Sequence, residues 1–390
     1  MSEIKKLIER LCPDGVEYKK LGEVLDYEQP SKYIVSSKDY LDEGIPVLTA
    51  GQTFILGYTD EDNGIYRASK DKPVIIFDDF TTSFHWVTFD FKVKSSAMKM
   101  LRPINNDINF RFIYYAMKCI KYETADHARQ WISKYSLFEI PVPPIEVQSK
   151  IVEILDNFTE LEAELEAELE ARRKQYEYYR NQLLTFDKVG GVRFERLKDV
   201  FEMRNGYTPS KNNSSFWDNG IIPWFRMEDI RENGRLLSDS IQHIAPSAIK
   251  GKGLFKANSI ILATSATIGE HALISVEHLS NQRFTNIYPK ENFLEIIDMK
   301  FIFYYMFIID EWCKQHTQQG SFASVDMNAL YNLLVPIPPL EEQQRIVSIL
   351  DRFESLTTDL QSGLPAEIEA RRKQYEYYRE KLLNFESKIA

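Results

Sequence analysis

A long internal repeat constrains this chain more than any other feature. The segment from Ala171 to Arg180 recurs without change at 370–379, and 141–148 matches 336–343 at most positions. Further matches join 151–156 to 346–351. Matches in this order do not arise by chance, and such self-similarity decides the architecture before any single element does. The chain is therefore a duplicated unit of about half of its 390 residues, each copy being a mixed domain followed by a long helix.

The apolar pattern predicts a long helix at the end of each copy. After the prolines at 143–144 and 338–339, apolar residues recur every three or four positions, as in a coiled coil. The first helix is predicted from Gln148 to Leu183, about 54 Å long at 1.5 Å per residue. In the second copy, Pro365 predicts a break, because proline inside a helix costs about 3 kcal/mol. A stripe this long is too large for one small domain to bury alone, so the two helices are expected to pack antiparallel.

The segments outside the helices are predicted to be mixed domains. Strand-like runs at 73–77, 86–93 and 259–263 alternate with polar loops, and breaker-free apolar segments at 110–120 and 299–309 predict one helix per domain. The predicted fold class is α+β: two tandem mixed α/β domains separated by two long antiparallel coiled-coil-like helices, with a pseudo-two-fold internal repeat. The expected regions are an N-terminal mixed domain at 1–139, a central helical region at 140–188, a C-terminal mixed domain at 189–335 and a distal helical region at 336–390.

Composition places the chain among ordinary globular proteins. Apolar residues make up 44% of it, no apolar stretch is long enough to span a bilayer, and the charged N-terminus does not resemble a signal peptide. The three cysteines lie far apart without a CxxC motif, which favours a reducing cytoplasm over a disulfide framework or a zinc site. The net charge of −10 does not exclude nucleic acid, because DNA binding needs a basic face and not a basic whole.

The repeated motifs resemble those of a known family. They are the Pro-x-Pro-Pro lead-in at 141–144 and 336–339, the Ile-Val-x-Ile-Leu-Asp helix start, and Arg-Arg-Lys-Gln-Tyr-Glu-Tyr-Tyr-Arg at 172–180 and 371–379. Segments 206–211 and 280–282 look like signatures of a second recognition domain. Together these segments resemble the specificity subunit of type I restriction–modification systems, and its type IC subfamily in particular, over essentially the whole chain.

The resemblance implies a DNA-reading role and no catalysis by this chain. Each recognition domain would read one half-site of a bipartite double-stranded site, across an unread gap of about six base pairs. Two methylation subunits, which methylate adenine at N6, would dock on the conserved helices, and restriction subunits could join them. S-adenosylmethionine, ATP and magnesium would lie on those partners and none on this chain, which would have neither a metal site nor a membrane association.

Candidate interface residues follow from residue type and position. Lysine, arginine and hydroxyl side chains suit phosphate contacts, and loop amides suit adenine readout. For each of them a solvated strand end or a turn cap is an equally open interpretation. The DNA-binding candidates are Gln52, Lys92, Lys94, Ser95, Ser96, Lys99, Arg129, Gln130, Arg204, Thr208, Lys211, Lys250, Lys252, Asn281, Gln282 and Arg283. The partner-binding candidates, which helical spacing also allows to be core residues, are Arg172, Tyr176, Tyr179, Arg371, Tyr375 and Tyr378.

Two alternatives stay open beside the specificity subunit. The chain has no phosphate-binding Gly-x-x-x-x-Gly-Lys-Ser/Thr loop, no Gly-x-Gly-x-x-Gly and no adenine-methyltransferase motif. Asp78, Asp90 and Lys92 have the order of a metal-dependent nuclease core, although three common residues in loose spacing occur often by chance. A stand-alone two-headed DNA-binding regulator would share the duplicated helices, and co-purification with a methylation subunit would distinguish it.

Overall fold

The duplication seen in the sequence is also a duplication of structure. The computed structural model describes residues 2–51, 53–124, 128–187, 191–318, 323–358 and 363–388. Unit 1 consists of Met1–Glu166 and Glu367–Ala390, and unit 2 of Ala167–Ala366. Each unit therefore contains one mixed domain together with parts of both helical regions.

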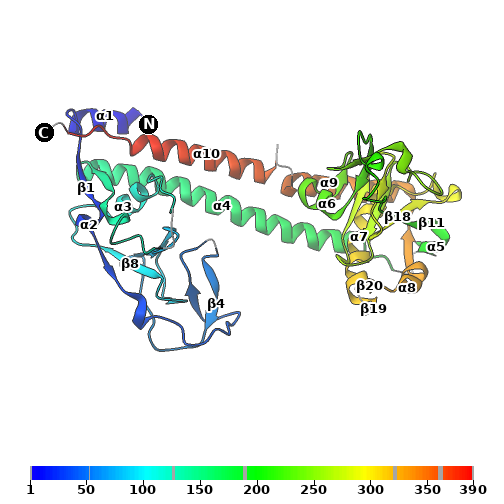
Figure 1. The fold of residues 1–390 in the computed structure, drawn as a ribbon, viewed down its shortest axis with the longest axis horizontal. Helices are drawn as coiled ribbons and strands as arrows, with labels where there is room; N and C mark the ends of the chain where they lie inside the picture. Colours follow the sequence, from blue (N-terminus) through cyan, green and yellow to red (C-terminus); the bar gives the residue numbers. More distant parts are fainter. Residues whose placement is uncertain are drawn as a thin grey trace. The chain divides into compact units, whose positions relative to one another are not determined.

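Unit 1 begins with a short helix and holds three small sheets (Figure 1). Its elements are α1 (Ser2–Leu11), β1 (Glu17–Lys20), α2 (Leu21–Val24), β2 (Leu25–Glu28), β3 (Ile45–Leu48), β4 (Ile55–Thr59), β5 (Val74–Asp78), β6 (Phe84–Val87), β7 (Lys92–Val93), β8 (Met98–Pro103), α3 (Phe110–Met117), β9 (Glu139–Val142), the first part of α4 (Ile145–Leu183) and most of α10 (Leu364–Leu382).

Unit 2 repeats this order with insertions. Its elements are the second part of α4, β10 (Arg193–Arg196), α5 (Leu197–Val200), β11 (Phe201–Asn205), β12 (Ile222–Phe225), α6 (Met227–Asn233), β13 (Leu236–Leu237), β14 (His243–Ile244), β15 (Ser259–Ala263), β16 (His271–Ile274), β17 (Leu279–Ser280), β18 (Phe284–Pro289), α7 (Met299–Gln315), β19 (Thr317–Gln318), β20 (Ser324–Val325), α8 (Met327–Asn332), β21 (Leu334–Ile337) and α9 (Leu340–Thr358).

The main sheet has the same strand order in both units. It is β2-β8-β5-β6 in unit 1 and β11-β18-β15-β16 in unit 2, where β13 is added at the edge in parallel. The central strand β5 has four consecutive buried residues, Val74–Phe77, and β15 is buried throughout. Strands covered on both faces read as continuous apolar runs, as these two do. The mixed α and β class predicted from the sequence is confirmed.

In unit 1, α10 packs antiparallel against the first part of α4 (Figure 1). Phe158 stacks on Tyr378 with ring centroids 5.5 Å apart. Further along α4, and nearer the start of α10, Arg372 donates hydrogen bonds of 2.5 Å to Glu162 and Glu166. The polar contact fixes the register that the apolar stripe leaves open.

In unit 2, α9 packs against the second part of α4 in the same manner. Phe353 of α9 stacks on Tyr179 of α4 at 5.8 Å, and Tyr176 lies 6.4 Å from the same ring. Helix α4 is continuous for 39 residues and begins at Ile145, three residues earlier than predicted. The expected break near Pro365 is confirmed, since Gly363 forms a bend and α10 begins only after it, at Leu364. Pro365 lies in the first turn of α10, where its missing N–H costs no hydrogen bond.

A buried glutamine joins domain to helix in each unit. The Gln148 amide accepts from Asn109 N–H at 2.8 Å and donates to the Pro143 carbonyl at 2.7 Å. Gln343 accepts from Asp298 N–H at 2.9 Å and donates to the Pro338 carbonyl at 2.8 Å. The glutamine of the Pro-Pro lead-in therefore ties the start of α4 or α9 to the start of the domain helix α3 or α7.

Candidate DNA interface

In unit 2, several predicted DNA contacts meet at one edge of the main sheet. There β11 and β15 end and β18 begins. Tyr207 N–H donates to the Ser280 carbonyl at 2.8 Å, and the hydroxyl of Thr208 donates to the Gln282 amide oxygen. Arg283 is exposed and Asn281 is half-buried on the same loop. The structure thus brings residues from two distant segments, 206–208 and 281–283, into one polar edge.

Gly206 permits the two loops of this edge to approach. A Cβ atom added at Gly206 would lie 2.2 Å from the carbonyl oxygen of Ser280 and 2.4 Å from that of Asn281. These are backbone atoms that cannot move aside as a flexible side chain would. Only glycine therefore fits here, which explains its place in the 206–211 motif.

A basic groove runs along the outer strand β11, from Arg204 toward the end of the sheet opposite this edge. It is a cavity of about 690 Å³. Arg204 packs over the Phe255 ring at 4.2 Å and donates to the carbonyl oxygens of residues 253 and 254. Glu202 is the single carboxylate among the residues that line the groove. The lining cations are Arg204 and Lys252, which were predicted, and Lys198, Lys256 and Lys290, which were not.

The remaining second-domain candidates are placed close to Tyr207 or on an exposed loop. Lys250 N–H donates to the Tyr207 hydroxyl at 2.8 Å, and its side chain is exposed. Lys211 is exposed as well. The lysines at 198, 256 and 290 were missed because they stand singly in the sequence, and only the folding of β11 against the 252–256 loop and β18 gathers them.

Unit 1 has the corresponding edge where β5 ends. Asp79 N–H donates to the Ala97 carbonyl at 2.8 Å, and Lys94 N–H donates to the Leu48 carbonyl at 3.1 Å. Lys94 and Ser96 are exposed and Ser95 is half-buried. The 94–97 loop is thus placed beside the β5–β6 turn. Gln52, also predicted here, lies outside the described residues.

Three predicted DNA contacts of unit 1 are instead buried. Lys99 forms an ion pair with Asp79 at 3.2 Å. Lys92 pairs with Glu61 at 2.8 Å and lowers the pKa of that carboxyl through its hydrogen bond. Gln130 donates to the Ala128 carbonyl at 2.7 Å and accepts from the Tyr122 hydroxyl at 2.8 Å. The expectation that these three side chains lie at the surface is wrong, because each fills a polar position inside the domain.

Arg129 remains a surface candidate near the same residue. Its guanidinium is half-exposed and lies 3.9 Å from Asp79. Trp131 N–H donates to the other oxygen of Asp79 at 2.8 Å. Asp79 therefore fastens the 129–131 segment to the β5–β6 turn, and this leaves Arg129 at the loop edge.

The nuclease-like triplet does not form a common site. Asp78 accepts from Phe80 N–H and Thr81 N–H at 2.8 and 2.9 Å, so it caps its own turn. Asp90 pairs with Arg67, and Lys92 with Glu61. No cluster of three or more histidine, cysteine, aspartate or glutamate residues suited to a metal ion occurs in the part of the chain that the structure describes.

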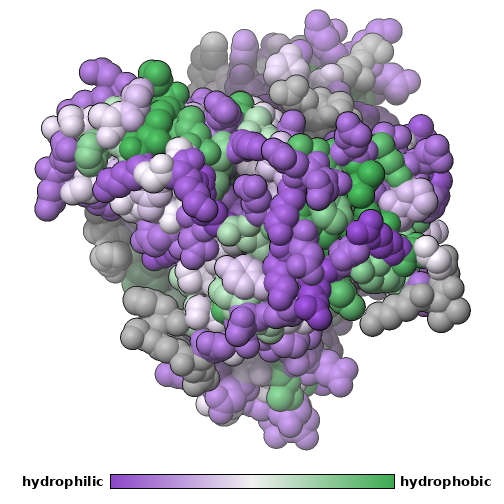
Figure 2. Space-filling model, turned by 90° about the vertical axis from the view of Figure 1, so that its right-hand side faces the viewer, coloured by the Kyte–Doolittle hydropathy of each residue, from purple (hydrophilic) through white to green (hydrophobic). Residues whose placement is uncertain are grey.

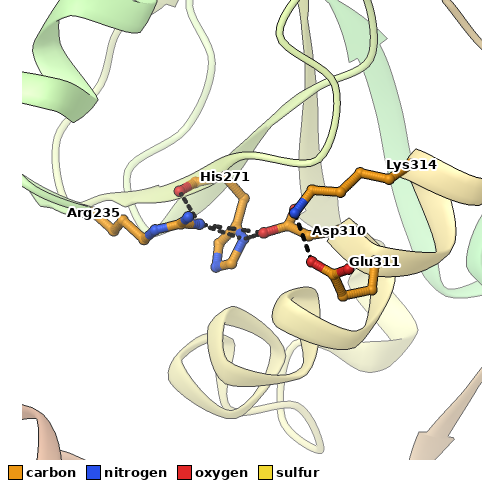
Figure 3. Close-up of polar contacts among 5 residues, drawn as sticks. All are labelled: Arg235, His271, Asp310, Glu311 and Lys314. Carbon is orange, nitrogen blue, oxygen red and sulfur yellow. Dashed lines mark hydrogen bonds and ion pairs between the residues drawn. The ribbon is translucent and has the colours of Figure 1, made fainter. Parts of the chain in front are cut away.

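One buried His–Asp–Arg network needs separate consideration (Figure 3). His271 Nδ1 lies 2.7 Å from Asp310, and Arg235 donates to the same carboxylate oxygen at 3.2 Å. Burial lowers the pKa of His271 despite the neighbouring carboxylate. Because the imidazole is fully enclosed between β16 and α7, this network joins a strand to a helix and is not accessible to a substrate.

The predicted partner-binding tyrosines divide into inner and outer positions. Tyr176 is buried, and Tyr375 packs against the core of unit 1. Tyr179 and Tyr378 lie closer to the surface, each stacked on a phenylalanine of the facing helix. The predicted partner contacts at Tyr176 and Tyr375 are therefore better described as contacts between the helices of each unit.

Tyr178 and Tyr377 are the most exposed aromatics of the same segments. Their exposed fractions are 64% and 58%. Each makes an edge contact with the next tyrosine, at 5.4 and 5.3 Å. Arg172 and Arg371 lie on the same segments, and each donates to a glutamate four residues earlier at 3.4 Å. The spacing of the three tyrosines along the helix did not show which of them faces the solvent, because the direction of the helix face toward its neighbour was not known from sequence.

The surface visible in Figure 2 is mainly hydrophilic, and hydrophobic side chains form small separate groups. None of the described helices is both long and apolar enough to cross a membrane. A polar surface with a basic groove suits a charged ligand better than an apolar one.

Comparison with known proteins identifies the family. The model of the type I restriction modification DNA specificity domain matches twice, at residues 13–171 and 190–370. The chain is 46% identical to the Escherichia coli type I restriction enzyme EcoR124I/EcoR124II specificity subunit, over 99% of this chain and 98% of that one. It is 54% identical to the E. coli EcoprrI specificity subunit over 48% of this chain and 49% of that one.

Solved structures show the same fold at low sequence identity. A chain from "Structural basis underlying complex assembly and conformational transition of the type I R-M system" superposes with a TM-score of 0.62 at 17% identity, covering 96% of this chain and 98% of that one. The S subunit from M. genitalium superposes with a TM-score of 0.51 at 15% identity, covering 95% and 96%. The chain belongs to the family of type I restriction–modification DNA specificity subunits, which recognise DNA and are not themselves catalytic.

Proposed function

We propose that this chain selects a bipartite DNA site, with each unit reading one half-site through the loop edge of its main sheet. The main support for the proposal is that each of the two units has such a loop edge. In unit 1 the β5–β6 turn adjoins the 94–97 loop, and in unit 2 the segments 206–208 and 281–283 join. Both edges carry exposed cations, hydroxyls or amides, which are the groups that contact phosphates and base edges.

Two methylation subunits would dock on the duplicated surfaces around Tyr178 and Tyr377, and restriction subunits would join through them. These surfaces have the same sequence, so one type of partner can occupy both. Adenine methylation, S-adenosylmethionine binding and ATP hydrolysis would belong to the partners. The half-sites are expected to be separated by about six unread base pairs, within one helical turn.

Methylome sequencing tests the proposal directly. A host that carries methylation subunits would be sequenced with this chain, without it, and with Gln282→Ala. The intact chain should direct adenine methylation to one bipartite sequence, and the variant should relax the specificity of one half-site while leaving the other unchanged. Exposed Gln182 of α4 offers a matched control, since Gln182→Ala should leave both half-sites intact. Methylation that does not depend on the chain, or a single undivided site, would contradict the proposal.

A further inference from the structure

Unit 1 contains a cavity lined by two cations and, among the described residues, by no carboxylate. It has a volume of about 420 Å³ and lies between the β5–β6 turn, the end of α3 and α10. Lys118 and Arg379 supply the positive charges. Hydroxyl groups of Thr81, Thr82 and Ser83 line the same space. A concave site of this composition suits an oxyanion, because the cations attract it and the hydroxyls can donate to it.

The equivalent place in unit 2 is built differently. There Phe307 stands at the position of Lys118, and Arg180 at that of Arg379. The Arg180 guanidinium packs over the Phe307 ring at 4.2 Å, so the cation of unit 2 is satisfied by an aromatic face. Both arginines also lie over a tyrosine of their own helix, at 5.4 Å in unit 2 and 5.3 Å in unit 1. What differs between the repeats is therefore the second cation, Lys118, whose ammonium lies 5.2 Å from the centre of the Tyr114 ring.

The two cations of this cavity are not neutralised by an ion pair with any residue that the structure describes. Neither Lys118 nor Arg379 forms an ion pair there, and the buried Nε of Arg379 has no hydrogen-bond acceptor. The nearest ion pair, Lys121 with Glu380 at 3.1 Å, is already balanced. Reduced hydration, and then the charges of Arg379 and Arg111, lower the pKa of Lys118, and the negative charge of Glu162 offsets this only in part. Two like charges facing one cavity oppose folding unless an anion joins them.

The hydroxyl side of the cavity is a constrained turn. Thr82 has φ of 60°, a conformation that β-branched residues rarely adopt. The Asp78 carboxylate holds the turn by accepting from Phe80 N–H and Thr81 N–H. The Thr81 and Ser83 hydroxyl oxygens lie 2.6 Å apart. Strain of this kind persists where the surrounding structure requires a particular placement of side chains.

We infer that the Lys118–Arg379 cavity is an anchor for one phosphate of the DNA backbone next to the half-site read by unit 1. The inference rests on the proposed function, because the same β5–β6 turn forms the loop edge of unit 1. The inference also means that unit 1 makes a phosphate contact that unit 2 does not make, since unit 2 has the Arg180–Phe307 stack in place of the second cation. Arg379 belongs to α10, so the distal helical region would take part in DNA binding by the first domain.

Lys118→Phe is the sharpest test, because it copies an arrangement that already folds in unit 2. Binding of a duplex that contains the methylated site would be measured by fluorescence anisotropy at several salt concentrations, using the complex of the full chain with its methylation subunits. Each phosphate contact contributes about 0.9 to the slope of log K against log salt. Lys118→Phe and Arg379→Gln should each reduce the slope by up to about 0.9, while Arg180→Gln should leave it unchanged.

Methylphosphonate substitution then identifies the phosphate. One neutral linkage beside the first half-site should weaken binding of the unaltered protein but have no further effect on Lys118→Phe. Lys118→Gln and thermal unfolding of each variant control for altered folding.

An unchanged salt slope in a complex that still binds its site would overturn the inference and leave the proposed function standing. Weakened assembly with the methylation subunit at unchanged DNA affinity would also overturn it and would assign the cavity to a partner carboxylate. Absence of any DNA binding by the unaltered complex would overturn both.

Discussion

Lys99 and Asp79 form an ion pair of 3.2 Å in which each side chain is only 1% exposed. Asp79 also accepts a hydrogen bond from Trp131 N–H, and the Lys99 ammonium lies 4.7 Å from the centre of the Tyr27 ring. A pair enclosed in this way cannot contact DNA without unfolding the turn around it. It instead fixes the β5–β6 turn, which belongs to the proposed interface.

Replacement of Lys99 should therefore reduce stability and not intrinsic DNA affinity. Lys99→Met leaves the Asp79 carboxylate without its buried cation and with only the half-exposed Arg129 guanidinium 3.9 Å away, and we expect a loss of about 3 kcal/mol in the free energy of unfolding. Urea denaturation measures this change. Lys94→Met, at an exposed site in the same loop region, should show the reverse: a stability change within about 0.5 kcal/mol and weaker DNA binding. Equal losses of DNA affinity in the two folded variants would contradict this assignment.

The stability of unit 2 should fall at mildly acidic pH because of His278. Burial lowers the pKa of His278 to about 4, against an ordinary value of 6.5, and outweighs the opposing contacts with Val276 and Asn286. Between these pH values the unfolded chain binds a proton that the folded protein does not, so the free energy of unfolding decreases as the pH falls. The full effect is about 3 kcal/mol. His278→Gln should reduce the dependence seen by denaturation between pH 7 and 4 and leave the part due to buried His271, whose pKa is also lowered, whereas His316→Gln at an exposed site should leave the whole dependence unchanged.

Each exposed tyrosine of the repeat should control one docking surface. Tyr178→Asp places a charge in an aromatic surface and is expected to remove one methylation subunit from the complex. Tyr377→Asp should remove one as well, and the double variant should lose both. Native mass spectrometry gives the stoichiometry. Retention of two methylation subunits by the double variant would refute docking at these positions.

The length of α4 should set the gap between the half-sites. Insertion of Leu-Glu-Ala-Glu after Glu168 extends the helix by about 6 Å. Local unwinding can absorb part of this length, since four residues form a stutter in a coiled coil. We expect a site with the same two half-sites and a gap longer by one base pair, visible by methylome sequencing. An unchanged gap would show that the helix does not act as a ruler.

The sequence predicted the elements that depend on local pattern. The duplicated halves, the long α4 stripe and the interruption near Pro365 all follow from periodicity and from the backbone restriction of proline. The resemblance of segment 206–211 to signatures of the family also pointed to the second domain. The repeat and the helices depend on the residues themselves and their near neighbours in the chain, whereas the need for glycine at 206 comes from the distant carbonyls of Ser280 and Asn281.

Only the tertiary structure decided which polar residues are free to bind. Lys92, Lys99 and Gln130 read as surface residues in sequence, yet Glu61, Asp79 and the Ala128 carbonyl, respectively, satisfy them in the interior. Conversely, Lys118 and Arg379 are 261 positions apart and acquire a shared role only because α10 returns to unit 1. Charge and burial at a site are set by contacts between distant segments, and local sequence does not encode which segments will meet.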